Sequence, residues 1–146
     1  MIDKQHIGRK LPAFRAVAEP GRLRFFAKAI GETNPVYFDE SAARDAGHPG
    51  LPLPPTFLFS LEFEQPDSSW RDEVGIDVSR ILHGEQSFTY HRLAYAGEVL
   101  LFESRIADIY DKKGGALEFV VRETRVTNVR GEHVADLHSV IVQRNG

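Results

Sequence analysis

The sequence predicts an α+β domain in which a long, curved antiparallel sheet is wrapped around one central apolar helix. Three observations predict it. Residues 1–70 hold most of the prolines and the short helical patterns, residues 80–144 read almost entirely as strand, and residues 57–63 are apolar on nearly every side. A helix that is apolar all round is buried all round, and three long strands have more apolar surface than a short sheet can leave in water. We therefore expect the strands to enclose this helix.

Length and composition restrict the function. A chain of 146 residues fits one domain, and we treat residues 1–146 as a single unit. The net charge of −3 gives no basic patch for nucleic acid, and the absence of cysteine excludes disulfides, thiolate nucleophiles and zinc–thiolate sites. No apolar run approaches the ~20 residues of a membrane span, and the N-terminus has no signal-peptide core. The sequence thus predicts a cytoplasmic protein that binds neither nucleic acid nor membrane.

The first half predicts three helices. One begins at Glu19-Pro20-Gly21, carries a stripe of apolar residues and ends at Gly31, which suits the position after a helix. A second runs from Asp39 to Gly47. Four prolines make residues 48–55 irregular, and Thr56 is then the expected N-cap of the apolar helix.

The second half predicts four strands, over residues 81–91, 98–110, 116–127 and 132–143, with hairpin loops at 112–115 and 128–131. Alternation in the first strand puts His83 and His91 on one face. Long strands around one apolar helix form the hot-dog arrangement. A generic α+β sandwich with helices on one face is the alternative, and an up-and-down barrel would leave no place for the apolar helix.

The segment from Gly31 to Asp39, which reads GETNPVYFD, carries the most specific motif. It resembles the MaoC-like enoyl-CoA hydratase/dehydratase family, whose motif reads Gly-Asp-x-Asn-Pro-(aliphatic)-His. The stretches HGEQ at 83–86 and AGE at 96–98 are similar to the fatty-acid-synthase-like dehydratase branch of that family. The resemblance covers roughly residues 5–143 and implies a hot-dog fold.

Two positions depart from the family motif. The resemblance implies that an Asp and a His bind and activate water for addition to a 2-enoyl thioester, but this chain has Glu32 and Tyr37 there. The glutamate side chain is one methylene longer than aspartate, and a misplacement of the catalytic carboxylate by about 1 Å can cost roughly 100-fold in rate. A phenol, with a usual pKa near ~10, is a poor general base at neutral pH. The alternative is that Glu32 and Tyr37 are only polar loop residues.

Other groups can contribute to such a site. His83 is a candidate because Gly84 beside it permits close approach, whereas His91 lies over ~25 Å away along the strand and cannot join it. His48 is a further candidate, and Arg92 could contact coenzyme A. The resemblance implies that backbone N–H groups at the start of the apolar helix, those of Thr56 and Phe57, bind the substrate carbonyl, and the positive end of the helix dipole suits this role. Ordinary helix capping by Thr56 is the alternative. No metal-binding spacing is present, so no metal site is expected.

The resemblance implies an (R)-specific 2-enoyl thioester hydratase or 3-hydroxyacyl thioester dehydratase that needs no cofactor, here with an altered catalytic pair, Glu32 and Tyr37. Glu32 would activate water, Asn34 would hold the loop, and Tyr37 or His83 would complete the proton relay. The alternative is a non-catalytic hot-dog subunit that shapes the acyl tunnel for a catalytic partner. A third reading, a hot-dog thioesterase, would use Glu62 or Glu64.

The partners expected from these readings are an acyl thioester, carried by coenzyme A or acyl carrier protein, and a second hot-dog subunit. An open sheet leaves edge strands that another chain can cover, so we expect a homodimer or a heterodimer.

Overall fold

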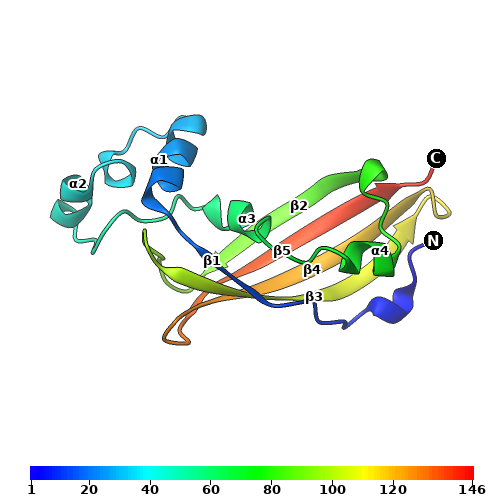
Figure 1. Cartoon of the computed structure of the whole chain (residues 1–146). Helices are drawn as coiled ribbons and strands as arrows, with labels where there is room; N and C mark the ends of the chain where they lie inside the picture. The colour runs from blue at the N-terminus through cyan, green and yellow to red at the C-terminus, as the bar shows by residue number, and fades with distance from the viewer.

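The computed structural model describes residues 1–146. Its strands form one five-stranded antiparallel sheet. In chain order the strands are β1 (Phe14–Val17), β2 (Ile81–Tyr90), β3 (Val99–Lys112), β4 (Leu117–Asn128) and β5 (His133–Arg144). Their order in the sheet is β1-β3-β4-β5-β2, so β3 to β5 form a meander and β2 pairs with its far side (Figure 1). The sheet therefore has two edges, the short β1 and the longer β2.

The four long strands confirm the prediction to within two residues at each end. The predicted hairpin loops are also confirmed, because Lys113, Gly114 and Gly115 have φ values of 53°, 62° and 89°, and Gly131 has a φ of 75°. These are backbone conformations that glycine adopts without strain. Strand β1 was not predicted, since four residues are too few for a reliable alternation.

Helix α3 (Phe57–Glu62) packs on one face of the sheet. The main core cluster joins its Phe57, Leu58 and Leu61 to side chains of β3, β4 and β5. The expectation that this segment is buried all round was wrong, because Phe63 is 67% exposed and Phe59 is only half-buried. A single open sheet covers only the near side of the helix, so the far side faces solvent in the isolated chain.

A second core cluster lies further along the same face of the sheet. Helix α4 (Trp70–Val74), which was not predicted, buries Trp70 and Val74 against Ile106, Ile109 and Val120. The turn after it explains how the helix ends: Gly75 has a φ of 91° and donates to the carbonyls of Arg71 and Asp72. Short 3₁₀ helices lie at η1 (Lys4–His6) and η3 (Val78–Arg80).

Helices α1 (Pro20–Ala29) and α2 (Glu40–Asp45), with the 3₁₀ helix η2 (Pro35–Tyr37) between them, extend beyond one end of the sheet (Figure 1). The predicted boundaries are confirmed. Pro20 opens α1 and Gly31, with a φ of 75°, follows its end; the Asp39 side chain accepts a hydrogen bond from Ala42 N–H at the start of α2. No helix of the structure has the length and apolar character needed to cross a membrane.

A β-bulge interrupts β2 at Gly84. His83 pairs with Ile141 while Glu85 pairs with Val140, so Gly84 is the extra residue. Because a bulge reverses the alternation of side chains, His83 lies on the helix-covered face and residues 85–89 continue in the opposite phase. The prediction that His83 and His91 share a face was therefore wrong. A Cβ at Gly84 would lie 2.6 Å from Val142 Cγ2, so the close approach that glycine permits here is to β5.

Candidate functional site

The motif loop between α1 and η2 is organised by its own polar side chains. Glu32 Oε1 accepts hydrogen bonds from the N–H groups of Thr33, at 2.8 Å, and Asn34, at 2.9 Å. Asn34 Oδ1 in turn accepts from Val36 N–H at 3.2 Å and caps η2. One carboxylate oxygen of Glu32 is thus committed to the fold of the loop, while Oε2 has no hydrogen-bond partner within the chain.

Tyr37, at the end of η2, lies close to Tyr90 at the end of β2. Tyr90 donates a hydrogen bond from its phenol to the carbonyl of Pro55 at 2.5 Å. Burial raises the pKa of Tyr90 to about 12, and the neighbouring Tyr37 phenol acts in the same direction. The motif loop, the end of β2 and the start of α3 therefore meet near the two phenols of Tyr37 and Tyr90.

The start of α3 offers fewer free donors than expected. Phe57 N–H donates to the Pro54 carbonyl at 2.9 Å, so it is already satisfied, whereas Thr56 N–H has no partner within the chain. Thr56 occupies the N-cap position, as predicted, but its side chain makes no capping hydrogen bond. Of the two donors expected to bind a substrate carbonyl, only Thr56 N–H is free.

His83 is distant from the motif loop. It is separated from Tyr90 by seven positions of β2, which corresponds to roughly 23 Å along an extended strand. Its imidazole is exposed and packs edge-on against Phe59 of α3, with 4.7 Å between the ring centroids. The structure thus does not bring His83 and Tyr37 into one proton relay within a single chain.

The two carboxylates considered for a thioesterase are both engaged in ion pairs. Glu62 is buried and its Oε2 lies 2.8 Å from Arg122 Nη2, while its Oε1 accepts from Thr124 at 2.7 Å. Glu64 forms an ion pair with Arg22 of α1. A carboxylate held in this way is poorly placed to activate water, which disfavours the thioesterase reading.

Open hollows lie away from the motif. One of about 560 Å³ opens on the polar face of the sheet and is lined by none of Glu32, Tyr37 or His83. Another, of about 540 Å³, is lined by Arg92, but this guanidinium pairs with Glu132 at 2.7 Å. His48 contacts Tyr95 through its Nδ1 at 3.3 Å and does not approach the motif residues through any hydrogen bond.

Sequence patterns missed one cluster altogether. The ligand atoms of His91, His133 and Asp136 all lie within 4.8 Å of one another, although no metal-like spacing joins them in the sequence. No metal site was expected from the sequence, because only spacing along the chain was considered and it did not single out this cluster. No local signal could have found them, since a contact between two strands brings His91 to the other two.

The fold and the motif loop together define a hot-dog domain of the hydratase/dehydratase class. Residues 5–137 match the family model described as FAS1-like, dehydratase domain region. The chain belongs to this family, which confirms the resemblance drawn from the motif.

Relatives and solved structures agree with this assignment. A UPF0336 protein of Streptomyces coelicolor is 38% identical over 98% of this chain and 95% of its own length. Among solved structures, the HadBC 3R-hydroxyacyl-ACP dehydratase complex of Mycobacterium tuberculosis is 26% identical, with a TM-score of 0.81 over 94% of this chain and 96% of that chain. A MaoC-like dehydratase has a TM-score of 0.84 and 23% identity, covering 97% of this chain and 43% of its own, and shares the fold.

Proposed function

We propose that this chain is the non-catalytic subunit of an (R)-specific 2-enoyl thioester hydratase/3-hydroxyacyl thioester dehydratase. In this proposal its hot-dog domain shapes the acyl tunnel, and a second hot-dog subunit supplies the catalytic Asp and His. The observation that supports this proposal most directly is the state of the motif. One oxygen of Glu32 accepts hydrogen bonds from the loop backbone, and the histidine position of the motif holds a phenol, Tyr37. The chain therefore lacks the Asp and His pair that activates water in the family motif.

The unpaired edge of the sheet supports a partner of this kind. Strand β2 pairs only with β5, so its other edge presents unpaired backbone groups. Beside it, Phe63 and Leu82 are 67% and 53% exposed, and Phe59 packs edge-to-face against Phe63 with 5.0 Å between the ring centroids. The similarity to HadBC, whose description names a complex, also supports assembly with a second subunit.

The proposed substrate is an acyl thioester carried by coenzyme A or acyl carrier protein. Because the thioester itself acidifies the α-carbon, the reaction needs no cofactor from this chain. Thr56 N–H, the free donor at the start of α3, is the group through which this subunit would contact the carbonyl oxygen or the acyl chain near it.

A second candidate is that the chain is an active hydratase by itself. The observation that favours it is the free Oε2 of Glu32, which could still orient a water molecule. In that case Tyr37, close to Tyr90, would have to donate the proton.

An assay of crotonyl thioester hydration, monitored by the loss of the thioester's ultraviolet absorbance, separates the two candidates. The purified chain alone should be at least about 100-fold slower than a mixture with a hot-dog subunit that contains Asp-x-Asn-Pro-x-His. Glu32→Gln in this chain should change the rate of the complex by less than about threefold, whereas replacing the partner subunit's motif histidine should abolish it. Rapid turnover by the chain alone, lost in Glu32→Gln, would refute the proposal in favour of the second candidate.

A further inference from the structure

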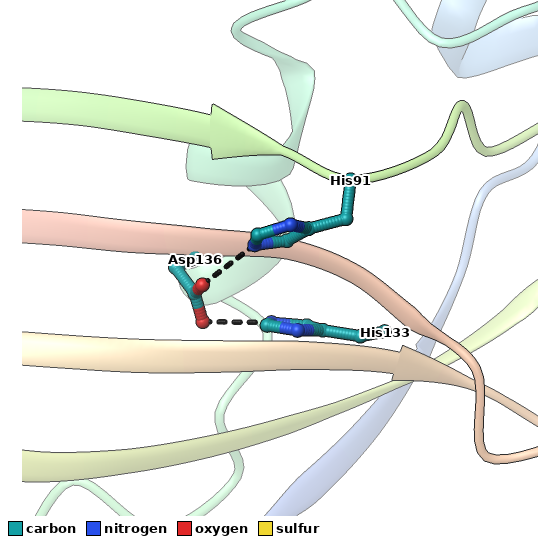
Figure 2. Close-up of side chains that lie close together, drawn as sticks. All are labelled: His91, His133 and Asp136. Carbon is teal, nitrogen blue, oxygen red and sulfur yellow. Dashed lines mark hydrogen bonds and ion pairs between the residues drawn. The ribbon is translucent and has the colours of Figure 1, made fainter.

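His91, His133 and Asp136 form a compact cluster on the face of the sheet opposite α3. Asp136 Oδ2 lies 2.8 Å from His91 Nε2, and Asp136 Oδ1 lies 2.8 Å from His133 Nε2. Figure 2 shows the two imidazoles stacked and both directed at the carboxylate, with 4.0 Å between the ring centroids. None of the three belongs to the motif loop or to the proposed acyl site.

Irregular backbone places these side chains together. His133 and Asp136 are three residues apart in β5 and would point to opposite faces of a regular strand. Val126 pairs with Ala135 while Thr127 pairs with His133, so Val134 is a bulge residue that brings His133 to the face of Asp136.

The same bulge also positions His91. The carbonyl of Val134 accepts hydrogen bonds from His91 N–H at 2.8 Å and from Arg92 N–H at 3.2 Å. Backbone hydrogen bonds to β5 therefore hold His91, in the bend that follows β2, beside His133 and Asp136.

Each oxygen of the Asp136 carboxylate has one imidazole partner, at 2.8 Å in both cases, so the three side chains converge on one point. The nearby cations are compensated elsewhere: Arg92 and Arg130 both pair with Glu132, each at 2.7 Å.

We propose that His91, His133 and Asp136 bind one divalent transition-metal ion of the Zn²⁺ type. Two imidazoles and a carboxylate are typical ligands of such ions. Tetrahedral donors about 2.1 Å from a metal lie about 3.4 Å apart. The ligand atoms of the three side chains all lie within 4.8 Å of one another, with nitrogen–oxygen distances of 2.8 Å, so small side-chain rotations would let them surround one ion in place of the shared protons. The side chains of His91, His133 and Asp136 are 41%, 29% and 48% exposed, so water can complete the coordination.

The proposed ion would stabilise the sheet near its β2 edge. His91 follows the last residue of β2, and the other two ligands come from β5, so the ion would cross-link the two strands at one end. A ligand that binds only the folded chain raises its melting temperature. At an ion concentration about 100 times Kd, we expect an increase of roughly 5–10 °C for a chain of this size.

Calorimetric titration of the untagged protein with Zn²⁺, together with the absorption spectrum of the Co²⁺ form, tests this site. The wild type should bind one ion, and His91→Ala and His133→Ala should each weaken binding at least tenfold. His138→Ala is the matched control, because His138 lies on the same face of β5 but outside the cluster, and it should bind as the wild type does. Mg²⁺ and Ca²⁺ should not raise the melting temperature, since both prefer oxygen ligands.

Two outcomes would overturn the proposal. One is the absence of stoichiometric Zn²⁺ binding by the wild type at pH about 7.5, where metal ligands are deprotonated. The other is binding that survives in the His91→Ala/His133→Ala double variant, which would place the ion elsewhere. Equal melting temperatures of this variant and the wild type without metal would show that the variant remains folded.

Discussion

The buried ion pair between Glu62 and Arg122 fixes α3 to the sheet, and its removal should be strongly destabilising. The side chains of Glu62 and Arg122 are only 3% and 9% exposed. Glu62 also accepts from Thr124, whose hydroxyl lies 2.8 Å from Ser104 Oγ. Both oxygens of the Glu62 carboxylate thus have a partner, whereas the buried Nε of Arg122 has none.

The magnitude follows from what the substitution leaves behind. In Glu62→Ala, Arg122 would be a buried cation without a counterion, which costs about 3–5 kcal/mol. Arg71 adds a second positive charge near Arg122, which increases the cost of leaving Arg122 without a counterion. Burial lowers the pKa of Arg71, and the nearby charge of Arg122 lowers it further. Since a domain is stable by only about 5–15 kcal/mol, Glu62→Ala should lose a large part of the free energy of unfolding.

Urea denaturation, with the unfolding free energy taken from the midpoint and slope, measures the effect. Glu64→Ala is the matched control, because Glu64 lies two residues away but forms only a partly exposed pair with Arg22 and should cost about 0–1 kcal/mol. In the double variant Glu62→Leu/Arg122→Leu both charges are absent, and stability should return to near the wild-type value or exceed it.

The result that would refute this reasoning is a loss of less than about 1 kcal/mol in Glu62→Ala, equal to the control. That outcome would mean that water or a shift of α3 solvates Arg122, and that the pair does not define the position of the helix. A double variant as unstable as Glu62→Ala would also contradict it, because the cost would then come from lost packing and not from the unpaired charge.

Two further variants test the region around β2. Gly84→Ala should destabilise the protein by about 1–3 kcal/mol, because the new Cβ would lie 2.6 Å from Val142 Cγ2 and 3.1 Å from the Val140 carbonyl; a thermal melt with no shift would contradict the bulge. Tyr90→Phe should cost about 0.5–1.5 kcal/mol through the lost hydrogen bond to Pro55. Because the pKa of Tyr90 is raised to about 12, its stabilising contribution is present below the unfolded value of about 10 and is lost as pH rises from there through 12. An alkaline phenol titration of the wild type against Tyr90→Phe checks this, and a missing late-titrating phenol would disprove it.

The strands were predictable because their signals are local. The runs 99–112 and 117–128 are long, rich in apolar residues and flanked by loops whose glycines adopt positive φ, so each can be predicted from its own residues and its neighbours. Helix α1 is similar, since Pro20 and Gly31 mark its ends chemically. The short elements β1 and α4 escaped prediction because four or five residues contain too little periodicity, and their burial comes from contacts with distant strands.

The β-bulges explain why the sequence-based assignment of side chains to the two faces of the sheet was wrong. Simple alternation put His83 and His91 together, but the extra residue at Gly84 separates them. The bulge at Val134 has the opposite effect and unites His133 with Asp136. A bulge has no reliable sequence signal, because it arises from how two strands pair and not from one strand alone.

The amino-acid sequence by itself determined the apolar helix, the long strands and the motif loop with Glu32 and Tyr37, because each depends on neighbouring residues and on side-chain chemistry. Only the tertiary structure decided that α3 is covered on one side, that Glu62 is neutralised by Arg122, and that His91 meets His133 and Asp136. The physical reason is that pairing across strands and burial depend on the whole chain, whereas propensity and turn chemistry act within a few residues.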